Sequence, residues 1–161
     1  MQIGQILSGN ATEDNFGHSV DISADGMIIF CGSLGSIYHD DPPGYVRVFS
    51  IEGDDILGME TFWKQIGQDI IREANDDQFG WSVSISDDGK ILAVGAQYSY
   101  HLRVYRMNDS ESGWVQLSDD ISAEYETSVS LSGDGNKVSI NSPMYYVNGD
   151  DSGRVRVFVW E

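Results

Sequence analysis

Hydrophobic and polar residues alternate along several short stretches of the chain, with the two-residue period of a β-strand. The stretches "SVSIS" (82–86) and "RVRVF" (154–158) both show this alternation. The stretch "KILAVGA" (90–96) is mostly apolar, which is typical of a strand that is buried on both faces. No segment shows a convincing helical period. The pattern therefore predicts an all-β protein.

The same pattern occurs three times along the chain. The first element of the repeat is "DNFGHSVDISADG" (14–26), "DQFGWSVSISDDG" (77–89) and, more weakly, "AEYETSVSLSGDG" (123–135). A second element is "YVRVFS" (45–50), "LRVYRM" (102–107) and "VRVFVW" (155–160). A third element occurs twice, as "WKQIGQDI" (63–70) and "WVQLSDDI" (114–121). Repeats of this length indicate stacked units of one supersecondary structure.

Each unit is predicted to hold four short antiparallel strands. An Asp-Gly pair, which is a strong hairpin signal, lies between the first and second strands at Asp25-Gly26, Asp88-Gly89 and Asp134-Gly135. We expect one repeat domain over 1–161, with units at approximately 16–70, 79–121 and 125–161 plus 2–7.

The pattern "FGxSVxxSxDGxxxAVGA…VRVY" resembles the FG-GAP repeats of integrin-α-like β-propellers, in the form found in microbial and algal surface proteins. The resemblance implies a propeller-like array of three four-stranded blades. It also implies binding or adhesion, in a secreted or cell-surface protein. The third unit departs from the pattern, with Tyr125-Glu126 in place of Phe-Gly. The calcium-loop signature of integrin-type repeats is missing, so the resemblance supplies no metal site.

The two ends of the chain resemble two parts of one strand. Trp160-Glu161 is similar to the start of the fourth strand at Trp63 and Trp114, and "QIGQ" (2–5) continues that pattern. We expect residues 2–7 to complete the third unit, in the same chain or in a second copy. Alternatively, the chain is an excerpt from a longer array.

The composition of the chain limits the kinds of molecule that it is expected to bind. The formal net charge of −17, from 26 acidic and 9 basic residues, argues against nucleic acid and permits cations or basic proteins. A single cysteine, Cys31, allows no internal disulfide, and its apolar counterparts Val94 and Ile140 predict a packed thiol. The apolar runs are too short for membrane insertion, and the first fifteen residues do not resemble a signal peptide.

The chain lacks recognisable catalytic motifs. Its histidines, His18, His39 and His101, stand at unrelated positions of the repeat. The repeated Trp63 and Trp114 are expected to pack between units rather than to bind sugars. We therefore expect a protein that is not an enzyme. A hydrolase that uses a carboxylate pair in a central channel is the catalytic alternative.

The loops carry the candidate binding residues. Acidic segments at 11–15 and 73–78 and the loops between the second and third strands are expected on one face. The tyrosines of that face are Tyr38, Tyr98, Tyr100, Tyr145 and Tyr146. Tyrosine is enriched in binding surfaces. Alternatively, these rings cap the junctions between units.

One loop could hold a hard cation. The segment "NGDDSG" (148–153) offers Asn148, Asp150 and Asp151 as oxygen ligands for Ca²⁺. No other cofactor is predicted. The sequence thus favours a binding or adhesion module for a protein or glycan. The non-catalytic alternative is an assembly unit that dimerises through open sheet edges.

Overall fold

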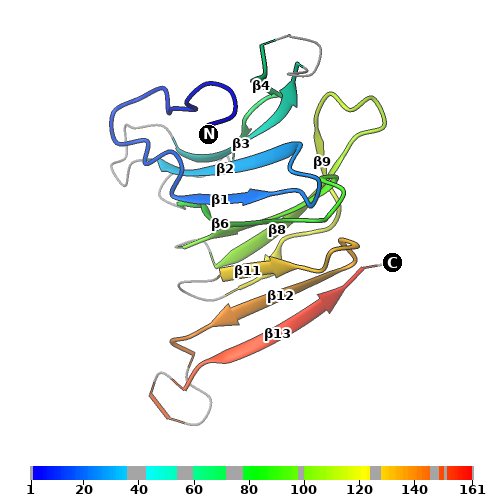
Figure 1. The fold of residues 1–161 in the computed structure, drawn as a ribbon. Coiled ribbons are helices and arrows are strands. Elements are labelled where there is room, and N and C mark those ends of the chain that lie inside the picture. The colour runs from blue at the N-terminus through cyan, green and yellow to red at the C-terminus, as the bar shows by residue number, and fades with distance from the viewer. Residues whose placement is uncertain are drawn as a thin grey trace.

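The computed structural model describes residues 2–35, 43–53, 60–71, 78–97, 100–123, 128–145, 149–150 and 152–160. These residues form thirteen strands and no helix. The described residues therefore contain no helix that could cross a membrane. The strands form three antiparallel sheets, which lie one beside the next along the molecule (Figure 1). The prediction of an all-β, propeller-like array of three units is confirmed.

Sheet 1 contains the first unit. Its strands are β1 (Ser19–Ile22), β2 (Ile28–Gly35), β3 (Pro43–Glu52), β4 (Phe62–Gln65) and β5 (Ile70–Ile71). Both β4 and β5 pair with β3, so together they are the predicted fourth strand, interrupted by a bend. Gly67 takes φ +70° within the bend, a backbone conformation that glycine adopts without a steric penalty.

Sheets 2 and 3 repeat this order. Sheet 2 contains β6 (Phe79–Ile85), β7 (Ile91–Ala96), β8 (His101–Met107), β9 (Trp114–Gln116) and β10 (Ile121–Ser122), with its fourth strand again divided. Sheet 3 contains β11 (Ser128–Leu131), β12 (Lys137–Ser142) and β13 (Arg154–Val159). In the described residues no strand pairs with the outer edge of β13.

The Asp-Gly hairpins form as predicted, and each is fixed by the serine that precedes it. The serine hydroxyl donates to the aspartate carboxylate in all three hairpins: Ser23 to Asp25, Ser86 to Asp88 and Ser132 to Asp134. This hydrogen bond lowers the pKa of the exposed Asp25 and Asp134 carboxyls. The serine is therefore part of the turn signal, beside Asp-Gly.

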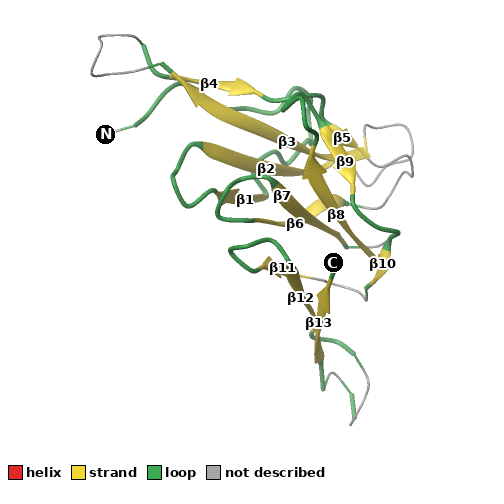
Figure 2. Cartoon of the chain, turned by 90° about the vertical axis from the view of Figure 1, so that its right-hand side faces the viewer, coloured by secondary structure: helices red, strands yellow, loops and turns green. Residues whose placement is uncertain are grey.

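Two apolar cores hold the three sheets together. The first lies between sheets 1 and 2 and includes Phe30, Val46, Phe79 and Val83. The second lies between sheets 2 and 3 and includes Leu102, Val104, Val129 and Ile140. The innermost strands β1, β6 and β11 follow one another in order (Figures 1 and 2).

Hydrogen bonds between the sheets also repeat at equivalent positions. The Ile85 backbone N–H donates to Asp21 (2.8 Å), and the equivalent Leu131 N–H donates to Ser84 (3.0 Å). Between hairpins, the Ala24 N–H donates to the Asp87 carbonyl, and the Asp87 N–H donates to the Gly133 carbonyl. One sheet-to-sheet interface is thus used twice within the chain.

The structure narrows the expectation for residues 2–7, which allowed pairing in the same chain or in a second copy, and it corrects the expectation for Trp160. Residues 2–7 do not pair with β13 of the same copy. Instead, the Trp63 backbone N–H donates to the Gln5 side chain (2.8 Å) and the Trp63 indole N–H donates to the Ile3 carbonyl (3.2 Å). Trp160 directly follows β13, the third strand, so it is not the counterpart of Trp63. A fourth strand needs a preceding hairpin loop, and none lies between Val159 and Trp160.

Candidate binding face

Antiparallel pairing brings two sets of connections to one end of the sheets. They are the loops between second and third strands and the segments that enter each first strand. Two hydrogen bonds join the sets: the Ser33 hydroxyl donates to the Asp14 carbonyl, and the Ala123 N–H donates to the Tyr100 carbonyl (2.6 Å). We call this end the loop face, with described residues 8–18, 100, 123, 143–145, 149–150 and 152–153.

Tyr100 is the most unusual residue on the loop face. Its backbone has φ +57°, which is a rare and strained conformation for a bulky residue. Its side chain is 50% exposed, while its carbonyl is held by Ala123. An exposed aromatic ring is thus held on a fixed, strained backbone immediately before β8.

Tyr145 lies in the connection between β12 and β13 and is partly covered. The Arg154 guanidinium lies 3.5 Å from the centroid of the Tyr145 ring, within the range of a cation–π interaction. The Tyr145 carbonyl also accepts hydrogen bonds from the Gly153 N–H (3.0 Å) and the Ser152 hydroxyl (3.1 Å). Tyr145 therefore closes its own loop. Within the described residues no ring contact joins it to Tyr100.

The remaining residues of the predicted site are Tyr38, Tyr98, Tyr146, Asn148 and Asp151, which lie outside the described residues. Of the three predicted calcium ligands only Asp150 is described, and it is exposed. In the described ranges, no three His, Cys, Asp or Glu side chains are grouped as a metal site would require. The calcium site stays a prediction.

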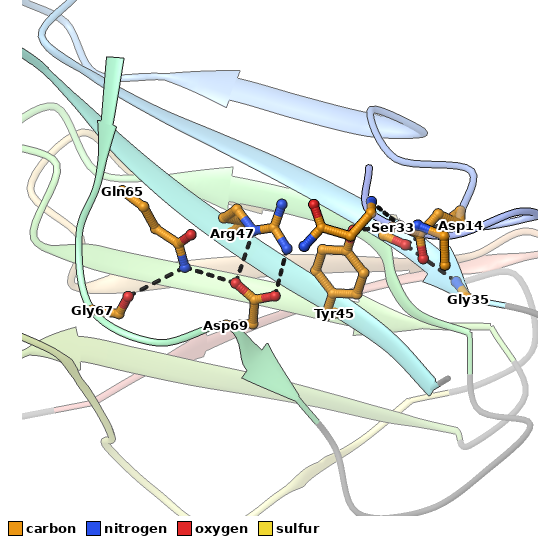
Figure 3. A network of polar contacts seen from close by, with 10 residues as sticks. Asp14, Ser33, Gly35, Tyr45, Arg47, Gln65, Gly67 and Asp69 are labelled. Atoms are coloured by element: carbon orange, nitrogen blue, oxygen red, sulfur yellow. Dashed lines mark hydrogen bonds and ion pairs between the residues drawn. The ribbon is translucent and has the colours of Figure 1, made fainter. Parts of the chain in front are cut away.

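A polar network in sheet 1 was not predicted (Figure 3). Asp14 is buried, and its carboxylate accepts hydrogen bonds from the Tyr45 hydroxyl (2.8 Å) and the Asn10 N–H (2.7 Å). Burial, followed by the bond to Asp14, raises the pKa of Tyr45 to about 12. The network ties the segment before β1 to β3, and so supports the loop face from beneath.

An ion pair continues this network along β3. The Arg47 guanidinium donates two hydrogen bonds to Asp69, at 2.8 and 2.7 Å, and Gln65 donates to the same carboxylate (2.7 Å). These bonds, chiefly those from Arg47, lower the pKa of Asp69. Asp69 and Gln65 stand on either side of the bend in the fourth strand. The pair therefore fastens that bend to β3.

Sheet 2 has the same arrangement at equivalent positions, with Arg103, Asp120 and Gln116. The bond to Asp120 raises the pKa of Arg103. The sequence does contain a signal for this cluster, because "W-x-Q-x-x-x-D-I" occurs at 63–70 and 114–121 and an arginine recurs in the third strand. Polar residues that recur at equivalent positions mark a structural role in the repeat.

A groove of about 780 Å³ lies between the divided fourth strands of sheets 1 and 2. Asp69 and Arg103 both line it, together with Tyr105, Trp114 and Gln116. Its two charged groups are already engaged, Asp69 by Arg47 and Arg103 by Asp120. The Trp114 ring packs edge-on against Phe30 at 5.2 Å, as predicted for a tryptophan between units.

Two solved structures resemble this fold. Hydrazine synthase from Kuenenia stuttgartiensis matches with a TM-score of 0.50 at 16% identity, over 88% of this chain and 44% of that chain. A functionally unknown protein from Desulfotomaculum acetoxidans matches with a TM-score of 0.44 at 13% identity, over 96% and 54%. The chain thus spans about half of each. The likeness to hydrazine synthase supports the β-propeller fold alone.

Comparison with curated proteins gives no match. A comparison with protein families matches residues 73–117, which contain β6 to β8 and the start of the divided fourth strand, to the FG-GAP repeat. The predicted resemblance is thereby confirmed for the second unit. Residues 73–117 of this chain are an FG-GAP repeat, set in a β-propeller-like array of three sheets.

Proposed function

We propose that the chain is a non-catalytic binding module whose sheets hold the loop face as a recognition surface. Tyr100 carries this proposal, because its ring is half exposed on a strained backbone that Ala123 holds in place. Strained conformations persist where the surrounding structure enforces them, and they cluster at functional sites. A tyrosine fixed in this way offers contact area at a low entropic cost.

The charge of the chain indicates the kind of partner. A net charge of −17 produces a negative field that attracts basic surfaces and repels acidic ones. Glu13 and Asp150 are also exposed on the loop face. We therefore favour a protein with a basic surface, rather than a glycan, as the ligand. The resemblance to repeats of surface proteins favours a secreted or surface-exposed setting.

The experiment uses the whole labelled chain on an array of lysine- and arginine-rich peptides and on a glycan array. We expect binding to basic peptides that falls at least tenfold in Tyr100→Ala. Val115→Ala is the matched control, because Val115 is similarly exposed (56%) but lies on β9 at the outer rim. Tyr98→Ala and Tyr146→Ala test the rest of the predicted face.

Three results would contradict the proposal in different ways. Binding that is unchanged in all three tyrosine variants would remove the loop face as the recognition surface. Binding to glycans alone would replace the proposed ligand class. Turnover of glycosides or esters by the purified chain would overturn the non-catalytic assignment and favour the carboxylate-pair hydrolase.

A further inference from the structure

The outer face of β13 is apolar and uncovered. Val155 and Val157 are 69% and 65% exposed. Strand register makes them equivalent to Val46 and Val48 of β3 and to Leu102 and Val104 of β8, all of which are at most 1% exposed. In sheets 1 and 2 these positions are buried in the cores that are shared with the next sheet. Sheet 3 therefore presents an interface surface with no sheet against it.

The opposite end of the molecule presents the complementary surface. Val20 and Ile22 of β1 are 60% and 51% exposed, whereas the equivalent Val83 and Ile85 of β6 are each 8% exposed. The latter two are buried because they pack into the core that also contains Val46 and Val48. The open face of sheet 1 is thus equivalent to the surface of sheet 2 that packs against sheet 1. The open face of sheet 3 has no such surface against it.

We propose that two copies of the chain associate head to tail, so that sheet 3 of each copy covers sheet 1 of the other. Each open face is then covered by the same kind of surface that covers the equivalent face within the chain. Two copies give a ring of six sheets, which is within the usual range of four to eight for propellers. One copy would give three and three copies nine, both outside that range.

Backbone groups at the two ends match in the same way. Within the chain, Leu131 N–H donates to Ser84 and Asp87 N–H donates to the Gly133 carbonyl. Repeating these bonds between copies would move the Ile22 N–H from the Asp21 carboxylate (2.9 Å) to the Ser130 hydroxyl and would pair the Gly133 N–H with the Ala24 carbonyl. The hydrogen-bond pattern thus continues across the proposed interface without a new kind of contact.

The N-terminal segment supports the same arrangement, because it already has the shape of a fourth strand. Gly4 takes φ +67°, as Gly67 takes +70°, and Gln2 bonds to the Gly4 carbonyl as Gln65 bonds to Gly67, each at 3.2 Å.

The position of the segment matches as well. A side chain at Gly4 would meet Phe62 and Trp63 at the start of β4. A side chain at Gly67 would meet Ser112 and Gly113, which lie at the start of the equivalent strand β9. The segment therefore lies where the fourth strand of a sheet preceding sheet 1 would lie. In the proposed ring that sheet is sheet 3 of the second copy, and residues 2–7 pair with its β13.

We expect an association of moderate strength. The open face of sheet 3 carries Ser139 and Asn141, where sheets 1 and 2 have Phe30 and Gly32 or Ala93 and Gly95. The net charge of −17 on each copy adds repulsion. A dissociation constant of roughly 10 µM is a reasonable expectation for such an interface. Salt should strengthen the dimer, because it screens the repulsion between like-charged copies.

The experiment measures the mass of the chain in solution by sedimentation, from about 1 to 500 µM in about 0.5 M salt. We expect a monomer that becomes a dimer as concentration rises. Val157→Lys should raise the midpoint about fiftyfold or more, beyond this concentration range, whereas Val159→Lys should leave it unchanged. Val159 is on the same strand face and is 68% exposed, but its equivalents are the partly exposed Ser50 and the exposed Arg106. Both positions are already exposed, so neither lysine should unfold the chain.

A mixing experiment tests the head-to-tail geometry. Val20→Lys and Val157→Lys should each be monomeric alone, since each damages both interfaces of the ring. Mixed together they should form a 1:1 complex, because one undamaged pair of faces remains. A Val20→Lys variant that dimerises like the wild type would overturn the proposal in favour of β13-to-β13 association. A strict monomer throughout, or open polymers, would also overturn it.

Discussion

At the scale of single residues, Asp69 connects charge to strand geometry. Its carboxylate accepts two hydrogen bonds from Arg47 and one from Gln65. Asp69→Asn keeps the shape but leaves the mostly buried Arg47 charge without its counter-ion. We expect the free energy of unfolding to fall by about 2 kcal/mol, the usual size for hydrogen bonds to charged groups. Chemical denaturation measures this loss. The control is Asp119→Asn, because Asp119 is exposed and lies next to Asp120, the equivalent of Asp69 in sheet 2. This control should change the free energy of unfolding little.

The same carboxylate predicts a dependence on pH. The pKa of folded Asp69 is lowered below its ordinary value of 3.8, so its contribution to stability is present above that value and is lost as the pH falls through the folded pKa. The stability difference between the wild type and Asp69→Asn should therefore shrink below about pH 4. A difference that stays constant down to pH 2 would contradict the role of the ionised pair. Urea titrations at successive pH values measure it.

Cys31 should be unreactive in the folded chain. Its side chain is buried in β2, and burial raises the pKa of its thiol to about 11. The thiolate is the reactive form, so alkylation by iodoacetamide at pH 8 should be slow until the chain is unfolded in guanidinium chloride. Mass spectrometry counts the labelled chains. Rapid, complete labelling of the native chain would show that sheet 1 opens readily.

At the scale of elements, the sequence predicted the hairpins well and the fourth strands poorly. Asp-Gly between alternating segments is a local signal, and it placed the connection at Gly89 and its equivalents correctly. The division of the fourth strand depends on Arg47 and Asp69, which are distant in sequence and meet only when the strands pair. Trp160 was misplaced for a related reason, because a matching tryptophan does not reveal a missing hairpin loop.

Two equivalent glycines separate local strain from contact between sheets. Gly80 has φ +94°, and a β-carbon there would lie 2.8 Å from the Ser33 carbonyl and 2.9 Å from the Tyr45 carbonyl of the neighbouring sheet. Gly17 has φ +84° but nothing within 4 Å. Gly17→Ala should therefore cost about 1 kcal/mol from strain alone. Gly80→Ala should cost roughly 2 kcal/mol more through overpacking.

Thermal unfolding of both variants in the Val157→Lys background measures these costs without a contribution from association. Equal losses at the two positions would mean that the sheets adjust freely to an added methyl group. The comparison is sharp because both glycines occupy the same place in the repeat, and only Gly80 has a sheet against it.

At the scale of the whole molecule, the sequence predicted the number of units but not how the ends lie. The repeat specified three sheets, and the alternation specified which residues face inward. The location of residues 2–7 could not be predicted from the sequence. A segment this short can bind to any sheet that offers contacts like those of Trp63 with Ile3 and Gln5. The candidate site was predicted only as a set of tyrosines on one face. The strain at Tyr100 and the cover that Arg154 gives Tyr145 arise from tertiary contacts.

Head-to-tail association makes the stability of the chain depend on its concentration. A ligand or partner that binds only the folded state stabilises it by mass action, so the midpoint of thermal unfolding should rise as the concentration of a dimer rises. We expect an increase of several degrees between about 1 and 300 µM for the wild type and for Val159→Lys. Val157→Lys should show almost none. Scanning fluorimetry at matched salt measures all three. An equal concentration dependence in Val157→Lys would mean that the copies meet through some other surface, since that lysine lies at the centre of the proposed interface.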